Sequence, residues 1–245
     1  MSHNIELKEG ALIISDAHYS SSRPELLALI KDIHSKKILI SQLILMGDIF
    51  DALFKQVPKT QDNNKEVIKL LNEISEETEL IYLEGNHDFN LQSIFLNAKI
   101  IGLNEQPIIC SFKDKRVALA HGDFDIGIAY KIYTSFIRNS LMLFLLNFIN
   151  TLTNNYILNK LDTYLDKKDD CKEFIGFETY IKNRQLDVFK CEYFIEGHYH
   201  QNMSFSYPKF NYINLAAFAC NQRYFTVKLI KDNELKIDEN EYVEI

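Results

Sequence analysis

The stretch ELIYLEGNHD, residues 79–88, ends an apolar run at a glycine and then presents an amide, an imidazole and a carboxylate in succession. Four further apolar runs end in turns of the same character, namely ALIISDAH (11–18), QLILMGDIFD (42–51), RVALAHGD (116–123) and YFIEGHYH (193–200). Short apolar runs that stop at such turns are typical of buried strands. Apolar residues recur at helical spacing in 24–37 and 64–77, between the first three runs, so the sequence predicts an α/β fold.

The composition describes a folded protein with an acidic surface. A chain of 245 residues with 47% hydrophobic residues can bury a substantial core. Its formal net charge of −7 argues against a nucleic-acid partner, which would need a broad basic surface. The first residues, MSHNIELKEG, lack the cationic and apolar segments of a secretory signal, so we expect a cytoplasmic protein.

The cysteines and the C-terminal segments give further expectations. No CxxC pair occurs, which predicts buried free thiols in place of a zinc site or disulfides at all four cysteines, Cys110, Cys171, Cys191 and Cys220. The segments 210–218 and 223–239 are rich in aromatic and β-branched residues, so we expect them to form closing antiparallel strands.

Residues 126–185 interrupt the alternation of strands and helices and predict a helical insertion, or cap, between core segments 1–125 and 186–245. Within it, LMLFLLNFI (141–149) is apolar nearly all round, yet nine residues are too few to cross a bilayer, which takes about 20. We therefore expect this run to be covered by the insertion itself, by a partner or by lipid. A helical hairpin that buries its own apolar face, or a dimer interface, is the simpler alternative.

The turns after the predicted strands collect most of the histidines, because five of the seven lie there and only His3 and His34 lie elsewhere. Loops at the carboxyl ends of strands in α/β sheets meet at one edge, so these side chains can converge. Each turn alone could be an ordinary surface turn, but their joint occurrence favours a metal site. Imidazole and carboxylate ligands suit manganese, iron or zinc, and Asp48 is the natural bridging ligand. The candidate ligands are Asp16, His18, Asp48, Asn86, His121, His198 and His200.

The five turns in this order resemble the calcineurin-like metallophosphoesterases, whose pattern is DxH, GD, GNH[DE], H and GHxH. The resemblance covers 11–125 and 186–245 and implies a four-layer αββα sandwich of two mixed β-sheets flanked by helices. It implies two divalent metal ions, manganese being expected, with Asp48 shared between them. The first ion would be held by Asp16, His18, Asp48 and His200, and the second by Asp48, Asn86, His121 and His198.

The resemblance also implies hydrolase chemistry. Two divalent ions about 3.5–4 Å apart can deprotonate a water and bind the oxygens of a phosphoryl group. Asp48 would take part as the bridging ligand, and Asn86 would ligate through a neutral amide. His87 would stand beside the metals as a proton donor or as a partner of the transition state.

The insertion indicates the substrate. A helical insertion between HGD and GHxH resembles the bacterial UDP-2,3-diacylglucosamine pyrophosphatases of lipid A synthesis, which produce UMP and 2,3-diacylglucosamine 1-phosphate. Asp125 and Tyr130, shortly after HGD, strengthen the resemblance, whereas His87 departs from it because those enzymes have arginine there. A phosphomonoesterase or phosphodiesterase with another substrate therefore stays open, as does a non-catalytic protein-binding scaffold.

The expected substrate contacts and partners follow from this resemblance. The candidate substrate-binding residues are Asn86, His87, Asp125, Tyr130, Arg138, Lys160 and Lys167. The insertion has eight basic and six acidic residues, so it is the locally basic part of an acidic chain. We expect it to hold the protein peripherally against anionic lipid, on the inner face of the cytoplasmic membrane. The sequence leaves the oligomeric state open.

Overall fold

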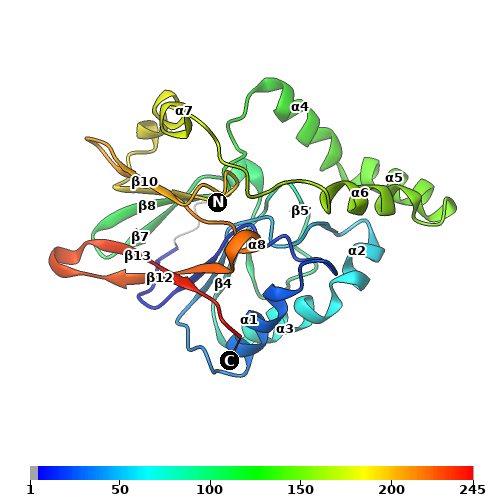
Figure 1. Cartoon of the computed structure of the whole chain (residues 1–245), viewed down its shortest axis with the longest axis horizontal. Helices are drawn as coiled ribbons and strands as arrows, with labels where there is room; N and C mark the ends of the chain where they lie inside the picture. Colours follow the sequence, from blue (N-terminus) through cyan, green and yellow to red (C-terminus); the bar gives the residue numbers. More distant parts are fainter. Residues whose placement is uncertain (1–4, 245) are drawn as a thin grey trace.

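A six-stranded sheet forms one half of the protein in the computed structural model, which describes residues 5–244 (Figure 1). Its strand order is β13 (Leu235–Glu241), β12 (Arg223–Leu229), β1 (Leu12–Ile14), β2 (Leu43–Leu45), β4 (Leu80–Leu83) and β6 (Lys99–Ile101). The strands β1, β2, β4 and β6 pair in parallel, whereas β12 pairs antiparallel with β1 and with β13. The sheet is therefore mixed, as the resemblance implies. Residues 1–4, within the N-terminal stretch used to predict the cellular location, and residue 245 lie outside the described part.

A five-stranded sheet forms the other half. Its order is β10 (Met203–Ser206), β11 (Asn211–Asn214), β9 (Tyr193–Glu196), β8 (Lys115–Ala120) and β7 (Ile108–Phe112). The expectation of closing antiparallel strands is confirmed for β11 on one side only, because β11 pairs antiparallel with β10 but parallel with β9. A short ribbon of β3 (Leu53–Phe54) and β5 (Asp88–Phe89) completes the strands.

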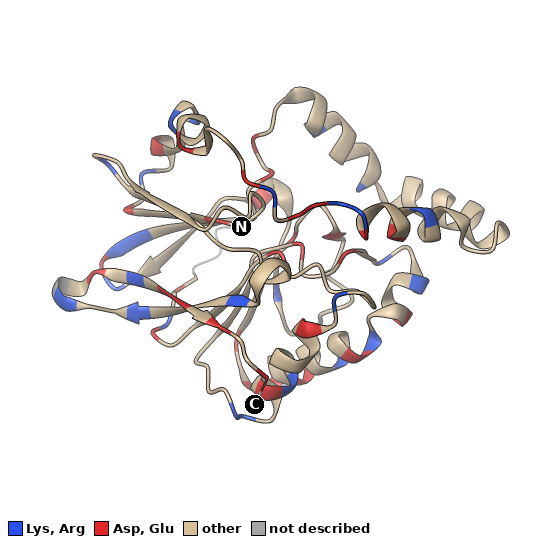
Figure 2. Cartoon of the chain, viewed as in Figure 1, with Lys and Arg blue, Asp and Glu red and all other residues tan. Residues whose placement is uncertain are grey.

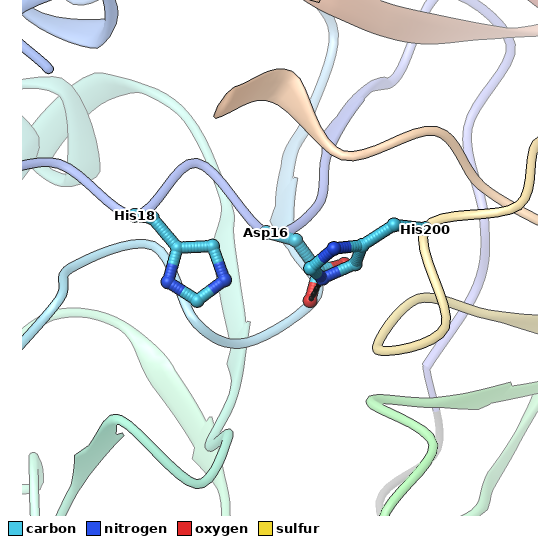
Figure 3. Close-up of side chains that lie close together, drawn as sticks. All are labelled: Asp16, His18 and His200. Atoms are coloured by element: carbon cyan, nitrogen blue, oxygen red, sulfur yellow. Dashed lines mark ion pairs between the residues drawn. The ribbon is translucent and has the colours of Figure 1, made fainter. Parts of the chain in front are cut away.

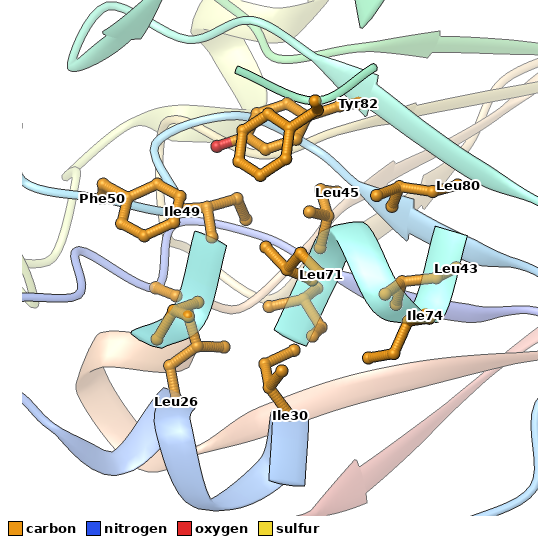
Figure 4. Packing of buried hydrophobic residues seen from close by; sticks show 14 of the residues in the cluster. Leu26, Ile30, Leu43, Leu45, Ile49, Phe50, Leu71, Ile74, Leu80 and Tyr82 are labelled. Atoms are coloured by element: carbon orange, nitrogen blue, oxygen red, sulfur yellow. The ribbon is translucent and has the colours of Figure 1, made fainter. Parts of the chain in front are cut away.

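Alternating side chains along the strands create the layers. On β4, Ile81 and Leu83 face the core between the two sheets, while Leu80 and Tyr82 face the helices outside. The apolar sides of α1 (Glu25–His34) and α3 (Lys65–Glu77) cover that outer face (Figure 4). Between β3 and α3 lies the short α2 (Pro58–Asn63).

The opposite sheet is covered by α7 (Phe177–Asn183). Its Phe177 and Ile181 share a buried cluster with Phe194 of β9 and Tyr212 of β11. Helix, sheet, sheet and helix thus follow one another, which confirms the four-layer αββα class. Short helical turns complete the chain at η1 (Leu103–Glu105), η2 (Leu186–Phe189), α8 (Phe218–Asn221) and η3 (Lys231–Asn233).

The helices α4 (Ile128–Ile137), α5 (Ser140–Leu152) and α6 (Tyr156–Leu165) project from the body of the sandwich (Figure 1). Together with α7 they fill the range 126–185. The division into a core (1–125 and 186–245) and an insertion (126–185) stays a prediction, since α7 also supplies the fourth layer of the sandwich. From here on, the cap means α4, α5 and α6 only, and the insertion means the whole range 126–185.

The apolar run of α5 is largely exposed. Leu143 is 6% exposed, but Phe144 is 60% and Phe148 57% exposed. Figure 2 shows α5 without the blue or red of charged residues. The insertion does not bury its own apolar face, so a partner or lipid remains to cover it. Within residues 5–244 no single helix is long and apolar enough to cross a membrane, although α4 and α5 together, bent by 60°, meet that length and composition.

The cysteine prediction is wrong for one pair. Cys171, after the cap, forms a disulfide with Cys220 of α8, with their Cα atoms 5.7 Å apart. The two lie 49 residues apart, and a pairing made by tertiary contact leaves no spacing motif. Cys110 and Cys191 are free and buried, as expected.

Candidate metal centre

The predicted ligands meet where β1, β2, β4, β8 and β9 end. Three sets of residues each bring their ligand atoms within 4.8 Å of one another: Asp16, His18 and His200; Asp48, His121 and His198; His18, Asp51 and His87. Figure 3 shows the loop after β1 presenting Asp16 and His18 to His200, which arrives from the loop after β9. The tertiary fold therefore joins side chains from both ends of the sequence.

The backbone is constrained at these residues. Five candidate ligands adopt a positive φ: Asp16 (49°), His18 (45°), Asp48 (51°), His198 (62°) and His200 (58°). Aspartate and histidine enter this left-handed region more readily than most residues, but at an energetic cost. Such strain persists only where surrounding contacts fix the conformation, and it is concentrated at functional sites.

The glycines of the motifs give the ligands room. A Cβ atom on Gly85 would overlap Oδ1 of Asp48, which belongs to a different loop. A Cβ atom on Gly197 would overlap Ser15 Oγ and Asp16 Oδ2. The GNHD and GHYH turns therefore need glycine because a ligand from another strand presses against their backbone.

Interior acceptors orient most of the histidines. The Nδ1 atoms contact Asp51 Oδ1 (His18, 3.1 Å), Asp51 O (His87, 3.0 Å), Met46 O (His121, 2.9 Å) and Asp170 O (His200, 2.5 Å). A carbonyl only accepts, so the Nδ1 of these last three histidines donates and Nε2 faces the centre. Among the described residues His18 Nε2 is buried without a hydrogen-bond partner. The Nε2 atoms of His121 and His200 lie instead against other candidate ligands, 3.4 Å from Asn86 Oδ1 and 3.0 Å from Asp16 Oδ1. Rings fixed at Nδ1, with Nε2 directed at the other donors, are what metal ligation by histidine requires, so the residues fit divalent ions.

Neighbouring charges shift the pKa values of the candidate ligands. Burial raises the pKa of Asp48, but His121 and His87 outweigh it and hold that pKa well below its usual value. Burial lowers the pKa of His121, yet the Asp48 carboxylate raises it well above the ordinary value. Burial and the neighbouring His121 lower the pKa of His198 to about 3. The centre thus places carboxylates as anions next to imidazoles, the donor set that manganese, iron or zinc accepts.

Asp88 ties two of the ligand loops together. Its carboxylate accepts from the backbone N–H groups of Asp48 (3.0 Å), Ile49 (2.7 Å) and Gly85 (3.0 Å) and from the hydroxyl of Tyr82 (2.5 Å). Burial, with Asp48 nearby, raises the pKa of Asp88 to about 7. The last residue of GNHD is therefore a structural clamp.

The predicted substrate contacts occupy several different surroundings. Asp125 forms a two-point ion pair with Arg184, with both distances 2.9 Å. The hydroxyl of Tyr130 donates to Asp123 at 3.0 Å. These two side chains are thus engaged with the protein itself, and their contact with substrate stays a prediction.

The basic candidates also differ in their positions. Arg138 donates to Gly85 O at 2.6 Å and lies 3.3 Å from Glu84, so it braces the GNHD loop from the cap. Lys160 and Lys167 are exposed on the cap and its C-terminal end. Any contact these two lysines make with substrate would be at the outer surface.

An apolar groove of about 390 Å³ leads from the centre into the cap. Asp51, Asn86 and His87 line its inner end. Phe54, Val57 and Phe89 of the body line part of the remainder. The cap lines most of the rest, with Tyr133, Ile137, Leu143, Leu146, Ile157, Leu158, Leu161, Tyr164 and Leu165. We call this cavity the groove. It joins the predicted reactive residues to an apolar surface.

Sequence reasoning missed Asp51, Arg23 and Asp170. Asp51 follows Asp48 by three residues in GDIFD, so its position in the same turn was a usable signal. Asp170 approaches His200 only through the path of the chain after α6, which no local pattern reveals. Arg23 reaches Asp170 at 2.7 Å by the same route.

A fold of this kind with such a centre is that of a metal-dependent phosphoesterase. The calcineurin-like phosphoesterase family matches residues 11–202, and the chain belongs to that family. The UDP-2,3-diacylglucosamine hydrolase of Pseudomonas fluorescens SBW25 is 24% identical over 198 residues, 78% of each chain. That of strain Pf0-1 is 29% identical over 154 residues, which are 61% of this chain and 62% of the relative. A solved archaeal phosphodiesterase has 15% identity and a TM-score of 0.45 over 94% of this chain and 99% of its own.

Proposed function

We propose that this protein hydrolyses the pyrophosphate bond of UDP-2,3-diacylglucosamine, giving UMP and 2,3-diacylglucosamine 1-phosphate. The observation that carries the proposal is the groove, because Asn86 and His87 line one end of it and apolar side chains of the cap line the other. The curated relatives that carry the name UDP-2,3-diacylglucosamine hydrolase support the same substrate. A soluble phosphoester without acyl chains would leave the apolar part of the groove unoccupied.

Two divalent ions complete the proposed centre, and we propose manganese among the metals, manganese, iron and zinc, that this donor set accepts. When bound, they would lower the pKa of a water and neutralise charge on the phosphoryl oxygens. One would be held by Asp16, His18, Asp48 and His200, and the other by Asp48, Asn86, His121 and His198. The chain's own contribution is to fix these side chains through the interior hydrogen bonds described above.

His87 is the proposed acid. Its Nδ1 proton is donated to Asp51 O at 3.0 Å, so Nε2 points the other way, 3.9 Å from Asp48 Oδ2. A proton held at Nε2 faces the centre and can pass to a leaving phosphate oxygen. The His87 backbone N–H donates to Asp48 Oδ1 at 2.8 Å, which couples the acid's position to the bridging ligand.

The groove would bind acyl chain. Each methylene moved from water to an apolar site contributes about 0.8 kcal/mol, so eight methylenes contribute about 6 kcal/mol before the costs of ordering. A diacylated substrate is then preferred over its unacylated counterpart by orders of magnitude. The exposed apolar face of α5 would rest on an anionic membrane surface, with Lys131 and Lys160 toward the headgroups. We place the protein on the inner face of the cytoplasmic membrane.

The deciding experiment compares UDP-2,3-diacylglucosamine with UDP-N-acetylglucosamine, with products identified by mass spectrometry. We expect the lipid to be cleaved with a much higher kcat/KM, and Leu146→Ser with Leu161→Ser in the groove to remove most of that advantage. Leu39→Ser is the matched control, since this exposed side chain lies outside the cap and does not line the groove. Equal cleavage of both substrates, with no loss in the groove variant, would instead favour a soluble phosphomonoester or phosphodiester.

A further inference from the structure

The segment that leaves the cap, residues 166–171, is fastened to the metal centre. We call it the strap; Figure 2 shows acidic and basic residues alternating between α6 and α7, where it lies. Its first residue, Asp166, accepts a hydrogen bond from Ser22 Oγ at 2.7 Å. Its fifth, Asp170, accepts through its backbone carbonyl from His200 Nδ1 at 2.5 Å. One short segment thus reaches both the loop after β1 and the loop after β9.

Arg23 extends this connection to a second ligand. Its guanidinium lies 2.7 Å from the Asp170 carboxylate and 3.9 Å from that of Asp51. Asp51 in turn contacts His18 Nδ1 at 3.1 Å. Because Arg23 also donates to Leu165 O at 3.3 Å, it holds the end of α6 as well. The strap therefore bears on His18 and His200, which belong to the same proposed metal site.

The disulfide holds the far end of the strap near Asp16, another candidate ligand of the same metal ion. Cys171 is bonded to Cys220 of α8. The N–H groups of Phe218 and Ala219 in α8 donate to Ser15 O (2.9 Å) and Asp16 O (3.2 Å). The disulfide thus connects the strap, through α8, to the backbone that presents Asp16.

We propose that the strap positions three of the four ligands of one metal ion, Asp16, His18 and His200, and that the Cys171–Cys220 disulfide holds the strap in place until a reductant breaks it. Asp170 and Arg23 are positioning residues. They act through His200 and Asp51 and do not touch the substrate. A dithiol reductant would deliver two electrons and two protons, breaking the S–S bond to give two thiols while itself becoming a disulfide. Cys171 is exposed, so such a reductant can reach the bond.

The test is manganese binding, measured by calorimetry on protein freed of metal, and it involves no substrate. We expect Arg23→Gln, Asp170→Asn and reduction of the unaltered protein each to weaken one of two binding events by about tenfold, since outer partners of ligands typically matter by 10–100-fold. The other event should be unchanged. With the small diester bis(p-nitrophenyl) phosphate at limiting manganese, kcat should fall while KM stays constant.

Two controls separate positioning from general damage. Lys182→Gln breaks an ion pair with Glu178 of 2.7 Å on α7, in the same insertion, and should leave both binding events intact. The double variant Cys171→Ser, Cys220→Ser should behave like reduced protein and ignore reductant; if it does not fold, reduction itself still gives the comparison. Unchanged manganese binding in all three altered forms, or equal weakening of both events, overturns the proposal. Neither result bears on the lipid substrate, which the product analysis tests separately.

Discussion

The metal centre and the cap differ in how their side chains are held: those of the centre lie against partners inside the protein, and many of those in the cap face outward. At the centre, every candidate ligand lies on a short loop after a buried strand and is held by partners inside the protein. In the cap, α5 turns large apolar side chains outward, and Phe144 is 60% exposed. The comparison shows that the candidate ligands are fixed by contacts within the sandwich, whereas the exposed apolar face of α5 has no cover among the described residues. Changes at the centre should therefore affect any substrate, and changes in the cap only a lipid one.

Asp48→Ala should have the largest effect. Asp48 lies in one ligand set with His121 and His198 and accepts the His87 N–H, and its loss would remove the proposed bridge between the two ions. We expect hydrolysis of bis(p-nitrophenyl) phosphate to be abolished and bound manganese, measured by elemental analysis, to fall. Leu146→Ser in the groove should keep that activity. An Asp48→Ala protein with normal metal content and turnover would contradict the dinuclear assignment.

His87→Ala should come next, with turnover reduced by about 10²-fold or more, because a positioned general acid contributes that much. Metal content should change little, since His87 Nδ1 is bound to Asp51 O and the ring is a proposed proton carrier. Kinetics on the small diester, together with elemental analysis, separate the two roles. Parallel loss of metal and activity would make His87 a ligand.

The difference between the two regions also explains what the sequence could predict. The gathering of the candidate ligands could be predicted because each follows a strand, as Asp16 follows β1 and His121 follows β8. The α/β fold follows from the alternation of strands and helices, whereas the four-layer sandwich is implied by the resemblance to the calcineurin-like family. By contrast, Cys171–Cys220 and the contact of Asp170 with His200 depend on where the chain after α6 comes to lie. The apolar pattern of 141–149 shows that a cover is needed, but it cannot show that the cover lies outside the protein.

Asp51→Asn should have a smaller effect, about tenfold on turnover. The amide keeps the volume and one acceptor but loses the charge next to His18 Nδ1, 3.1 Å away, so the ring is held less firmly. Metal affinity should fall with turnover, in contrast to His87→Ala. The matched control is Asp187→Asn, which breaks an exposed ion pair with Lys209 of 2.7 Å and should change neither quantity. Loss of turnover with unchanged metal affinity would mean that Asp51 acts through His87 alone.

The double variant Phe144→Ser, Phe148→Ser should have the smallest effect on turnover. We expect no change in turnover of the small diester, but weaker binding of the protein to membranes. Burying one such side chain contributes about 1.5–3 kcal/mol, so each replacement should weaken binding to vesicles rich in anionic phosphatidylglycerol by about tenfold or more. Each nearby lysine adds about 1 kcal/mol at the membrane surface, so Lys131→Gln and Lys160→Gln should weaken binding less and make it less sensitive to salt. Sedimentation with vesicles at low and high salt measures both effects. If the unaltered protein ignores vesicles and light scattering shows a dimer that the double serine variant loses, a second copy of the chain covers α5, and the cap's apolar face is an interface between proteins.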